Sequence, residues 1–114
     1  MLKLIITGRV GKDAVIRRTT GKSVVSFPIA NNERYTSKDG TKHEKTTWID
    51  CALWQHDETK IASYITKGQW LYLEGNPTAS AYLKEDEIIA TLKLNVTKIE
   101  FVGDKKAEDP TANW

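Results

Sequence analysis

The 114-residue sequence contains a single cysteine, Cys51, and only three prolines. One cysteine excludes an internal disulfide and any cysteine-rich zinc site. The residues around it, Ile49 and Leu53, are apolar, so a buried and unreactive thiol is a better interpretation than a nucleophile. We therefore expect a domain that is stabilised by its hydrophobic core and that carries no cofactor.

Long apolar runs are also missing. No segment approaches the uninterrupted length that a membrane helix requires. The apolar stretch 1–10 is interrupted by Lys3 and is too short for the apolar part of a signal peptide. These absences predict a cytoplasmic protein that does not associate with membranes.

The excess of positive charge is small. The formal net charge is only +2 and the pI is about 8.6, so total charge does not indicate a nucleic-acid-binding protein. Its distribution says more, because the stretch from Lys3 to Lys22 contains six basic residues and one acid, Asp13. A phosphate-binding surface needs such a local patch, whereas the alternative is an ordinary solvated surface.

Residues suited to catalysis or metal binding are scarce. His43 and His56 lie in separate polar segments, which is weak evidence for ligands that converge on one site. The segment Gly8–Gly11 lacks the lysine and the hydroxyl residue of a phosphate-binding loop. We predict no metal site and no enzymatic activity.

Alternating apolar residues and turn signals predict strands along most of the chain. The expected strands cover residues 2–10, 23–32, 46–54, 69–75, 78–83 and 88–102. Residues 15–18 are expected to continue the first strand after a bend, and the polar segment 34–45 is expected to be a loop. Only residues 57–67 suggest a helix, capped by Asp57, ended by Gly68, and apolar on the side of Ile61, Ala62, Tyr64 and Ile65.

Five strands with one helix between the third and fourth is the order of an OB-fold, a five-stranded Greek-key barrel. The predicted fold class is therefore all-β, with an OB-fold domain over residues 1–103. Residues 104–114 are polar and are expected to form a short flexible tail. The same barrel hosts many functions, so the fold alone does not determine what the protein does.

The third expected strand carries two tryptophans on one face. Period-two alternation separates Ile49, Cys51 and Leu53 from the set Trp48, Asp50, Ala52 and Trp54. If the aliphatic set faces the barrel interior, two indoles lie outside and must be covered by something. Nucleobases are one candidate, since stacking contributes on the order of 1–3 kcal/mol per base. A neighbouring loop or subunit is the other.

Several short motifs follow one another in a fixed order: GRVGKD (8–13), SFPIA (26–30), TW (47–48), CALW (51–54), ASYI (62–65) and YLEG (72–75). With this order and spacing the sequence resembles the bacterial single-stranded-DNA-binding proteins over nearly all of residues 1–103. The resemblance implies an OB-fold protein that coats single-stranded DNA without sequence preference.

The resemblance also implies the binding residues. The base-stacking positions of the family fall on Tyr35, Trp48, Trp54 and Tyr82, which all keep an aromatic ring. Its phosphate-contacting positions fall on Lys3, Arg17, Lys38 and Lys67, with His56 where a lysine is usual. Further candidates for phosphate contacts are Arg9, Arg18 and Lys84.

Some positions depart from the family pattern. Asp50 stands where an arginine is frequent, and Thr78, Ser80 and Ala81 replace a basic run. Each lost phosphate contact flattens the salt dependence, by a slope of about 0.7 for single strands. We therefore expect weaker binding than is typical of the family.

Trp70 and Tyr72 share an outward face of the fourth expected strand, which in the resembled family takes part in contacts within a homotetramer, a dimer of dimers. The alternative is packing against the helix or tail of the same subunit. In the tail, Glu108, Asp109 and the terminal Trp114 weakly resemble the acidic tip with a final aromatic residue that recruits protein partners in the family. An ordinary flexible end is the favoured interpretation.

The expected function is binding and protection of single-stranded DNA in replication, recombination, repair or plasmid and mobile-element transfer. One alternative is an OB-fold protein associated with RNA or a primosome, which would recognise the 2′-OH. Another is an interaction protein with weak DNA binding that works through Trp70 and the tail.

Overall fold

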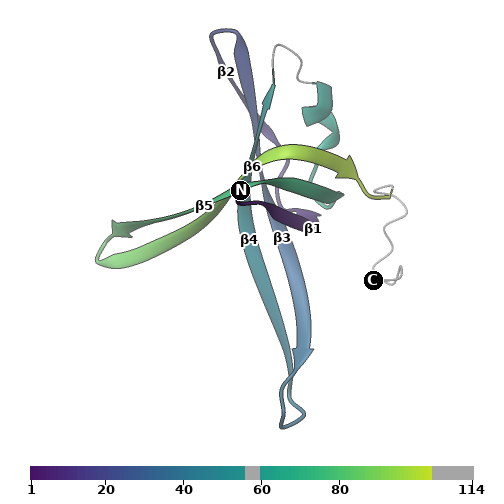
Figure 1. Cartoon of the computed structure of the whole chain (residues 1–114), viewed down its shortest axis with the longest axis vertical. Coiled ribbons are helices and arrows are strands. Elements are labelled where there is room, and N and C mark those ends of the chain that lie inside the picture. The colour runs from purple at the N-terminus through teal and green to yellow at the C-terminus, as the bar shows by residue number, and fades with distance from the viewer. Residues whose placement is uncertain (56–59, 104–114) are drawn as a thin grey trace.

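A computed structural model describes residues 1–55 and 60–103 of the chain (Figure 1). Its strands are β1 (Leu4–Val10), β2 (Val15–Thr19), β3 (Lys22–Thr36), β4 (Lys42–Gln55), β5 (Trp70–Lys84) and β6 (Glu87–Phe101). A short 3-10 helix, η1 (Lys60–Tyr64), lies between β4 and β5. The predicted all-β class is therefore confirmed.

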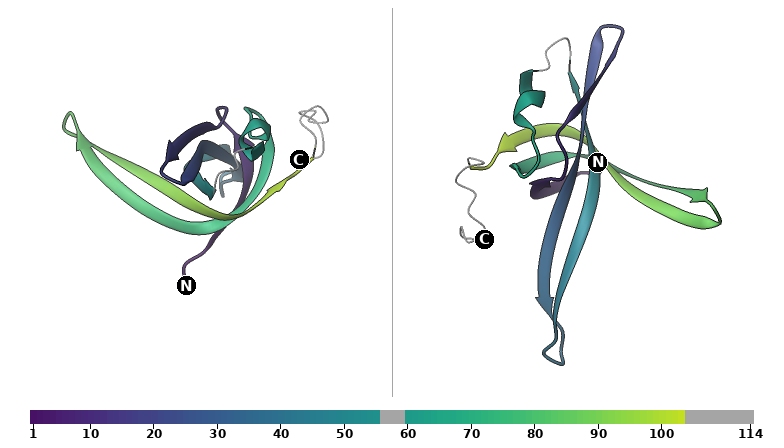
Figure 2. Two further views of the ribbon diagram at one scale, coloured as in Figure 1. Left: turned by 90° about the horizontal axis from the view of Figure 1, so that it is seen from above. Right: turned by 180° about the vertical axis from the view of Figure 1, so that it is seen from behind.

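The strands close into a five-stranded barrel. The sheet order is β1-β5-β6-β4-β3-β2, and an additional pairing between β1 and β3 completes the ring. β1 and β2 both pair with β3, so they act as one strand with a bend, as the sequence predicted. β4 and β6 are the only parallel neighbours among the described pairings, and they join the strands β1, β5 and β6 to the strands β4, β3 and β2. Figure 2 shows the molecule from above and from behind.

The bend between β1 and β2 explains the proline in β3. The Gly11 N–H donates to the Pro28 carbonyl oxygen at 2.9 Å, so this edge of Pro28 faces the bend. A proline lacks a backbone donor and fits where a neighbouring strand is interrupted. The break in β1–β2 therefore lies beside the one residue of β3 that cannot complete a ladder.

The interior of the barrel is filled by side chains that alternate along each strand. They include Val25, Phe27 and Ile29 of β3, Ile49, Cys51 and Leu53 of β4, Leu71 and Leu73 of β5, and Leu94 and Val96 of β6. On β4 this is the set that the alternation in the sequence assigned to the core. The residues between them face outward, which fixes the direction of the two indoles.

The segment 34–45, which was expected to be a loop, is mostly strand. β3 and β4 stay paired as far as Thr36 and Lys42, and they form a long arm that leaves the barrel (Figure 1). Cross-strand pairs support these polar strands. The Tyr35 and His43 rings stack with centroids 5.0 Å apart, and Arg34 lies 3.6 Å from the Glu44 carboxylate. The expected strands 69–75 and 78–83 are one continuous strand, because β5 runs through Pro77 into a second arm with β6.

The helical segment is shorter than the sequence suggested. η1 covers Lys60–Tyr64, and residues 57–59 of the predicted helix lie outside the described residues. In a 3-10 helix residues three apart share a side. Ala62 and Ile65 are accordingly both buried, and the Ile65 N–H donates to the Ala62 carbonyl oxygen at 3.1 Å. The expectation that Tyr64 joins the buried side is wrong, because its ring is 65% exposed and meets Phe101 edge-on.

The tip of the β5–β6 arm generates a stability prediction. Glu85 and Asp86 form its two-residue turn with φ of 48° and 66°, a conformation that favours asparagine and glycine. Changing Glu85→Asn together with Asp86→Gly should raise the free energy of unfolding by about 1 kcal/mol, measured by urea denaturation. Gly40→Ala, in the turn of the other arm at φ 87°, should lower it. An unchanged urea midpoint in the double variant would refute this view of the turn.

Candidate nucleic-acid interface

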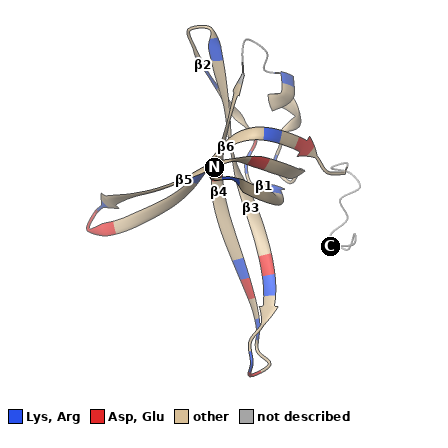
Figure 3. Cartoon of the chain, in the orientation of Figure 1, with Lys and Arg blue, Asp and Glu red and all other residues tan. Residues whose placement is uncertain are grey.

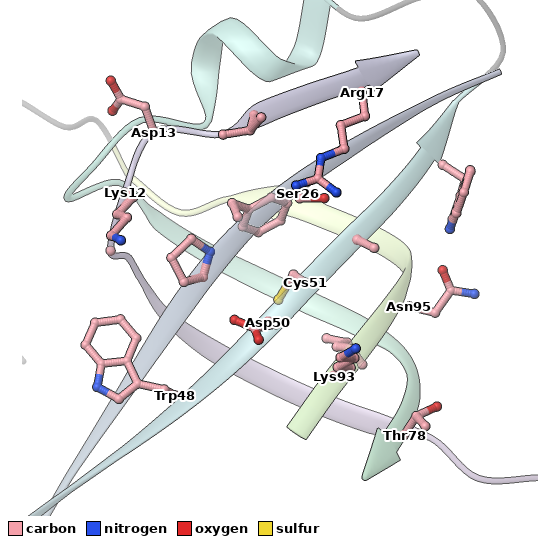
Figure 4. Close-up of a pocket in the computed structure, with 17 residues that line it drawn as sticks. Lys12, Asp13, Arg17, Ser26, Trp48, Asp50, Cys51, Thr78, Lys93 and Asn95 are labelled. Carbon is pink, nitrogen blue, oxygen red and sulfur yellow. The ribbon is translucent and has the colours of Figure 1, made fainter. Parts of the chain in front are cut away.

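A groove of about 1050 Å³ crosses the outside of the barrel (Figure 4). β4 runs along it, and residues of β2, β3, β5 and β6 and of the bend before β2 complete its lining. Small or flat side chains lie between its larger ones, among them Ser26, Pro28 and Ala52. These small side chains leave room for a flat ring to approach β4.

Two tryptophans of β4 line the groove. Trp48 is 57% exposed and Trp54 is 54% exposed. Between them along the strand, buried core side chains alternate with residues that face the groove. Gly11 borders Trp48 so closely that a Cβ at position 11 would lie 2.6 Å from the indole. The missing side chain at Gly11 thus lets this ring lie against the bend between β1 and β2. Both indoles therefore lie on the outer face of β4, which is the direction that the period-two alternation predicted.

Basic and acidic groups both face the groove. Arg17, Lys12 and Lys93 are the cations in its lining, and Asp13 and Asp50 are the anions. Asp13 has a structural contact, because its carboxylate accepts a hydrogen bond of 2.8 Å from the Lys67 backbone N–H. This bond places the backbone of Lys67, whose side chain is exposed, beside Asp13 at one end of the groove.

Two of these cations were missed by the sequence analysis. Lys12 belongs to the motif around Gly11, so its position could have suggested it. Nothing in the sequence around Lys93 indicates a place in the groove, because it lies there only through the parallel pairing of β6 with β4, in which its partner is Asp50. Such a pairing joins residues far apart in the sequence.

The other two predicted stacking residues lie on the arms. Tyr82 is 55% exposed and lies on the face of the β5–β6 arm that also carries Thr78, a groove residue. Tyr35 is 53% exposed on the β3–β4 arm, where one face of its ring is covered by His43. Trp48 and Trp54 therefore form the centre of the predicted set, and the two tyrosines lie away from that centre on separate arms.

Two predicted phosphate contacts, Lys3 and Arg9, are not brought to the groove. The Lys3 ammonium lies 2.7 Å from the Glu74 carboxylate, and the Arg9 guanidinium carbon lies 4.7 Å from the centroid of the Trp70 ring. Both therefore belong to the outer face of β1 and β5. Figure 3 shows how the charges are spread over barrel and arms.

The remaining predicted cations are scattered. Arg18 follows the groove residue Arg17 on β2, so alternation turns it to the other face of that strand. Lys38 lies in the turn of the β3–β4 arm and Lys84 at the tip of the β5–β6 arm. His56 lies outside the described residues.

Trp70 and Tyr72, the predicted interface residues, are half-buried on the outer face of β5. The Tyr72 hydroxyl donates to the Glu74 carboxylate, and this bond raises the pKa of Tyr72. Lys3 and Tyr72 together lower the pKa of Glu74. Ile5 lies beside them and is 56% exposed, so the face combines an aromatic and aliphatic surface with an internal network of charges.

Neither a metal centre nor a membrane helix is found in the described part of the chain. No group of three or more histidines, cysteines or carboxylates could hold a metal ion within residues 1–55 and 60–103. Over the same residues, no helix is long and apolar enough to cross a membrane.

Comparison with known proteins settles the relationship. The model of the single-strand binding protein family matches residues 1–102. The chain belongs to this family. A single-stranded DNA-binding protein of Bacteroides thetaiotaomicron is 35% identical over 109 residues, which cover 92% of this chain and 68% of that protein. One of Neisseria meningitidis is 30% identical over 90 residues, which cover 78% of this chain and 52% of that protein.

This member of the single-strand binding protein family thus spans about half the length of the Neisseria relative. A solved structure described as a Plasmodium falciparum SSB complex with ssDNA is similar to it, with a TM-score of 0.73 and 22% identity. The match covers 90% of this chain and 96% of that chain. The likeness confirms the predicted OB-fold.

The floor of the groove yields a prediction about Cys51. The side chain is 3% exposed, and burial raises the pKa of the thiol to about 12, with a smaller contribution from the charge of Asp50. At pH 8 the folded protein should therefore react with a thiol reagent only as fast as it opens, whereas the unfolded chain should react at once. The unfolded thiol loses its proton near pH 8.5, so this group should lower the stability as the pH rises above that value towards 12. Rapid labelling of the folded protein at pH 8 would contradict this assignment.

Proposed function

We propose that this chain binds single-stranded DNA by stacking bases on Trp48 and Trp54 and by neutralising phosphates with nearby cations. The observation that carries the proposal is the groove itself, in which two half-exposed indoles lie on one strand of a rigid barrel. Every base has a π-face, so such a platform accepts any sequence. Binding, rather than catalysis, is the activity we assign.

The phosphate contacts in this proposal come from Arg17, Lys12 and Lys93, which face the groove, and from Lys67 at its end. Tyr82, Tyr35 and the cations Lys38 and Lys84 extend the path along the two arms. Lys3 and Arg9 are engaged on another face, so we omit them from the path. Few groove cations and two groove acids together favour moderate affinity with a shallow salt dependence.

A titration with Trp54→Ala tests the stacking. Binding of a labelled oligothymidylate, followed by fluorescence anisotropy, should weaken about tenfold, because a base loses its platform. Tyr64→Ala removes an aromatic ring that is 65% exposed outside the groove, and it should leave the affinity unchanged. Binding by wild type should also weaken as salt is raised. An oligothymidylate that fails to bind at low salt, or that binds both variants alike, would refute the proposal.

We also propose that the outer face of β1 and β5 joins copies of this chain into an oligomer, a tetramer built as a dimer of dimers. Ile5, Trp70 and Tyr72 offer an aromatic and aliphatic surface of the kind found at self-complementary interfaces. Lys3 and Arg9 lie within this surface and belong to it in the proposal.

Ile5→Asp tests the interface. A charge at this exposed position should reduce the molar mass measured by light scattering, because an unpaired carboxylate would be buried between subunits. The exposed Val15→Asp, on β2, serves as a control and should leave the mass unchanged. A wild-type protein that is monomeric would rule out the interface.

In the cell, such a protein would protect exposed strands during replication, recombination, repair or transfer of mobile DNA. It would work where that DNA lies, which in a bacterium is the cytoplasm. Recruitment of protein partners through residues 104–114 remains a prediction, and these residues lie outside the described ones.

A further inference from the structure

An acid lies in the middle of the groove. Asp50 is exposed on β4, two residues from Trp48 and four from Trp54, so its Cα is about 7 Å and 13 Å from theirs along the strand. A base stacked on Trp48 would bring one edge towards this carboxylate. Asp50 is therefore placed to contact a base edge rather than only to repel phosphates.

The neighbours of Asp50 on the adjacent strands are different on the two sides. Pro28 is its partner on β3, and Lys93 is its partner on β6. Figure 4 shows the carboxylate between Trp48 and Lys93. Among the residues that the structure describes, Asp50 has no hydrogen-bond or ion-pair partner. The groove thus presents two acceptor oxygens, with the side chain of a lysine on the adjacent strand also lining it.

The bases differ in how well their edges match this arrangement. A carboxylate only accepts hydrogen bonds, and an ammonium only donates them. Guanine has two adjacent donors, N1–H and the N2 amino group, next to the acceptor O6. Thymine has one N–H between two carbonyl oxygens, and adenine and cytosine each place an amino group next to a ring acceptor. Guanine alone can satisfy both oxygens of a carboxylate while offering an acceptor to the lysine.

We propose that Asp50, assisted by Lys93, gives this groove a preference for guanine. The inference rests on the proposed function, since it assumes that bases stack on Trp48. The preference adds to binding that any sequence can achieve, because stacking and phosphate contacts remain the same for all bases. Asp50 is then a specificity residue. Its negative charge also repels phosphates, so the selectivity for guanine comes with weaker binding of the DNA backbone.

Alternating oligonucleotides of equal length test the preference. Thymidine–guanosine and thymidine–inosine repeats differ only in the N2 amino group, and a lithium buffer prevents guanine quadruplexes. In competition anisotropy the guanosine repeat should bind wild type about fivefold more tightly, at the low end of the discrimination by a bidentate contact. Asp50→Asn should bring the ratio near one, because the guanosine repeat loses its second hydrogen bond to the carboxylate, whereas both repeats gain equally from the removal of an acid from the groove.

Two further variants provide the controls. Glu100→Gln makes the same charge change on the face of Tyr72, and it should keep the fivefold ratio. Lys93→Met should weaken both repeats and also keep the ratio, because inosine retains O6. Equal binding of the two repeats by wild type, or a ratio that survives Asp50→Asn, would overturn the preference alone. If neither repeat nor oligothymidylate binds, the proposed function fails together with it.

Discussion

The register of β4 between β3 and β6 is the constraint on which the rest of the molecule depends. Ile49, Cys51 and Leu53 must face inward to fill the barrel, and this forces Trp48 and Trp54 outward. A shift of one residue would exchange the two faces completely. Core packing and the candidate binding surface are therefore two results of a single alternation, and neither can change without the other.

The same register explains how much could be predicted from the sequence. The alternation around Trp48 and Trp54 and the order of the strands are local patterns, so the barrel and the centre of the site could be predicted. Residues 34–45 looked like a loop because they are polar. Pairs such as Tyr35 with His43 that make them strands are visible only once two segments are aligned.

The positions of charged side chains were harder to predict than those of aromatic side chains. Lys3 was expected to contact phosphates from its position in the family and Arg9 as a further candidate, yet Glu74 and Trp70 contact them on another face. Lys93 was missed because only the parallel pairing with β4 brings it to the groove. An aromatic ring on a strand has its direction set by the alternation, whereas a long charged side chain takes its partner from strands distant in the sequence.

The barrel and the two arms differ in how many neighbouring strands support them. The chain extends over 55 × 43 × 31 Å, because the β3–β4 and β5–β6 arms project beyond the barrel in different directions (Figure 1). We expect amide hydrogens near Ile49 to exchange with solvent more slowly than those near Tyr35 and Tyr82, because a two-stranded ribbon alone protects the latter. In the proposed binding mode, a strand of nucleic acid that follows the groove onto the arms would restrict the local opening of these ribbons. The loss of conformational entropy in the arms would then offset part of the binding free energy of the contacts that the nucleic acid makes with them.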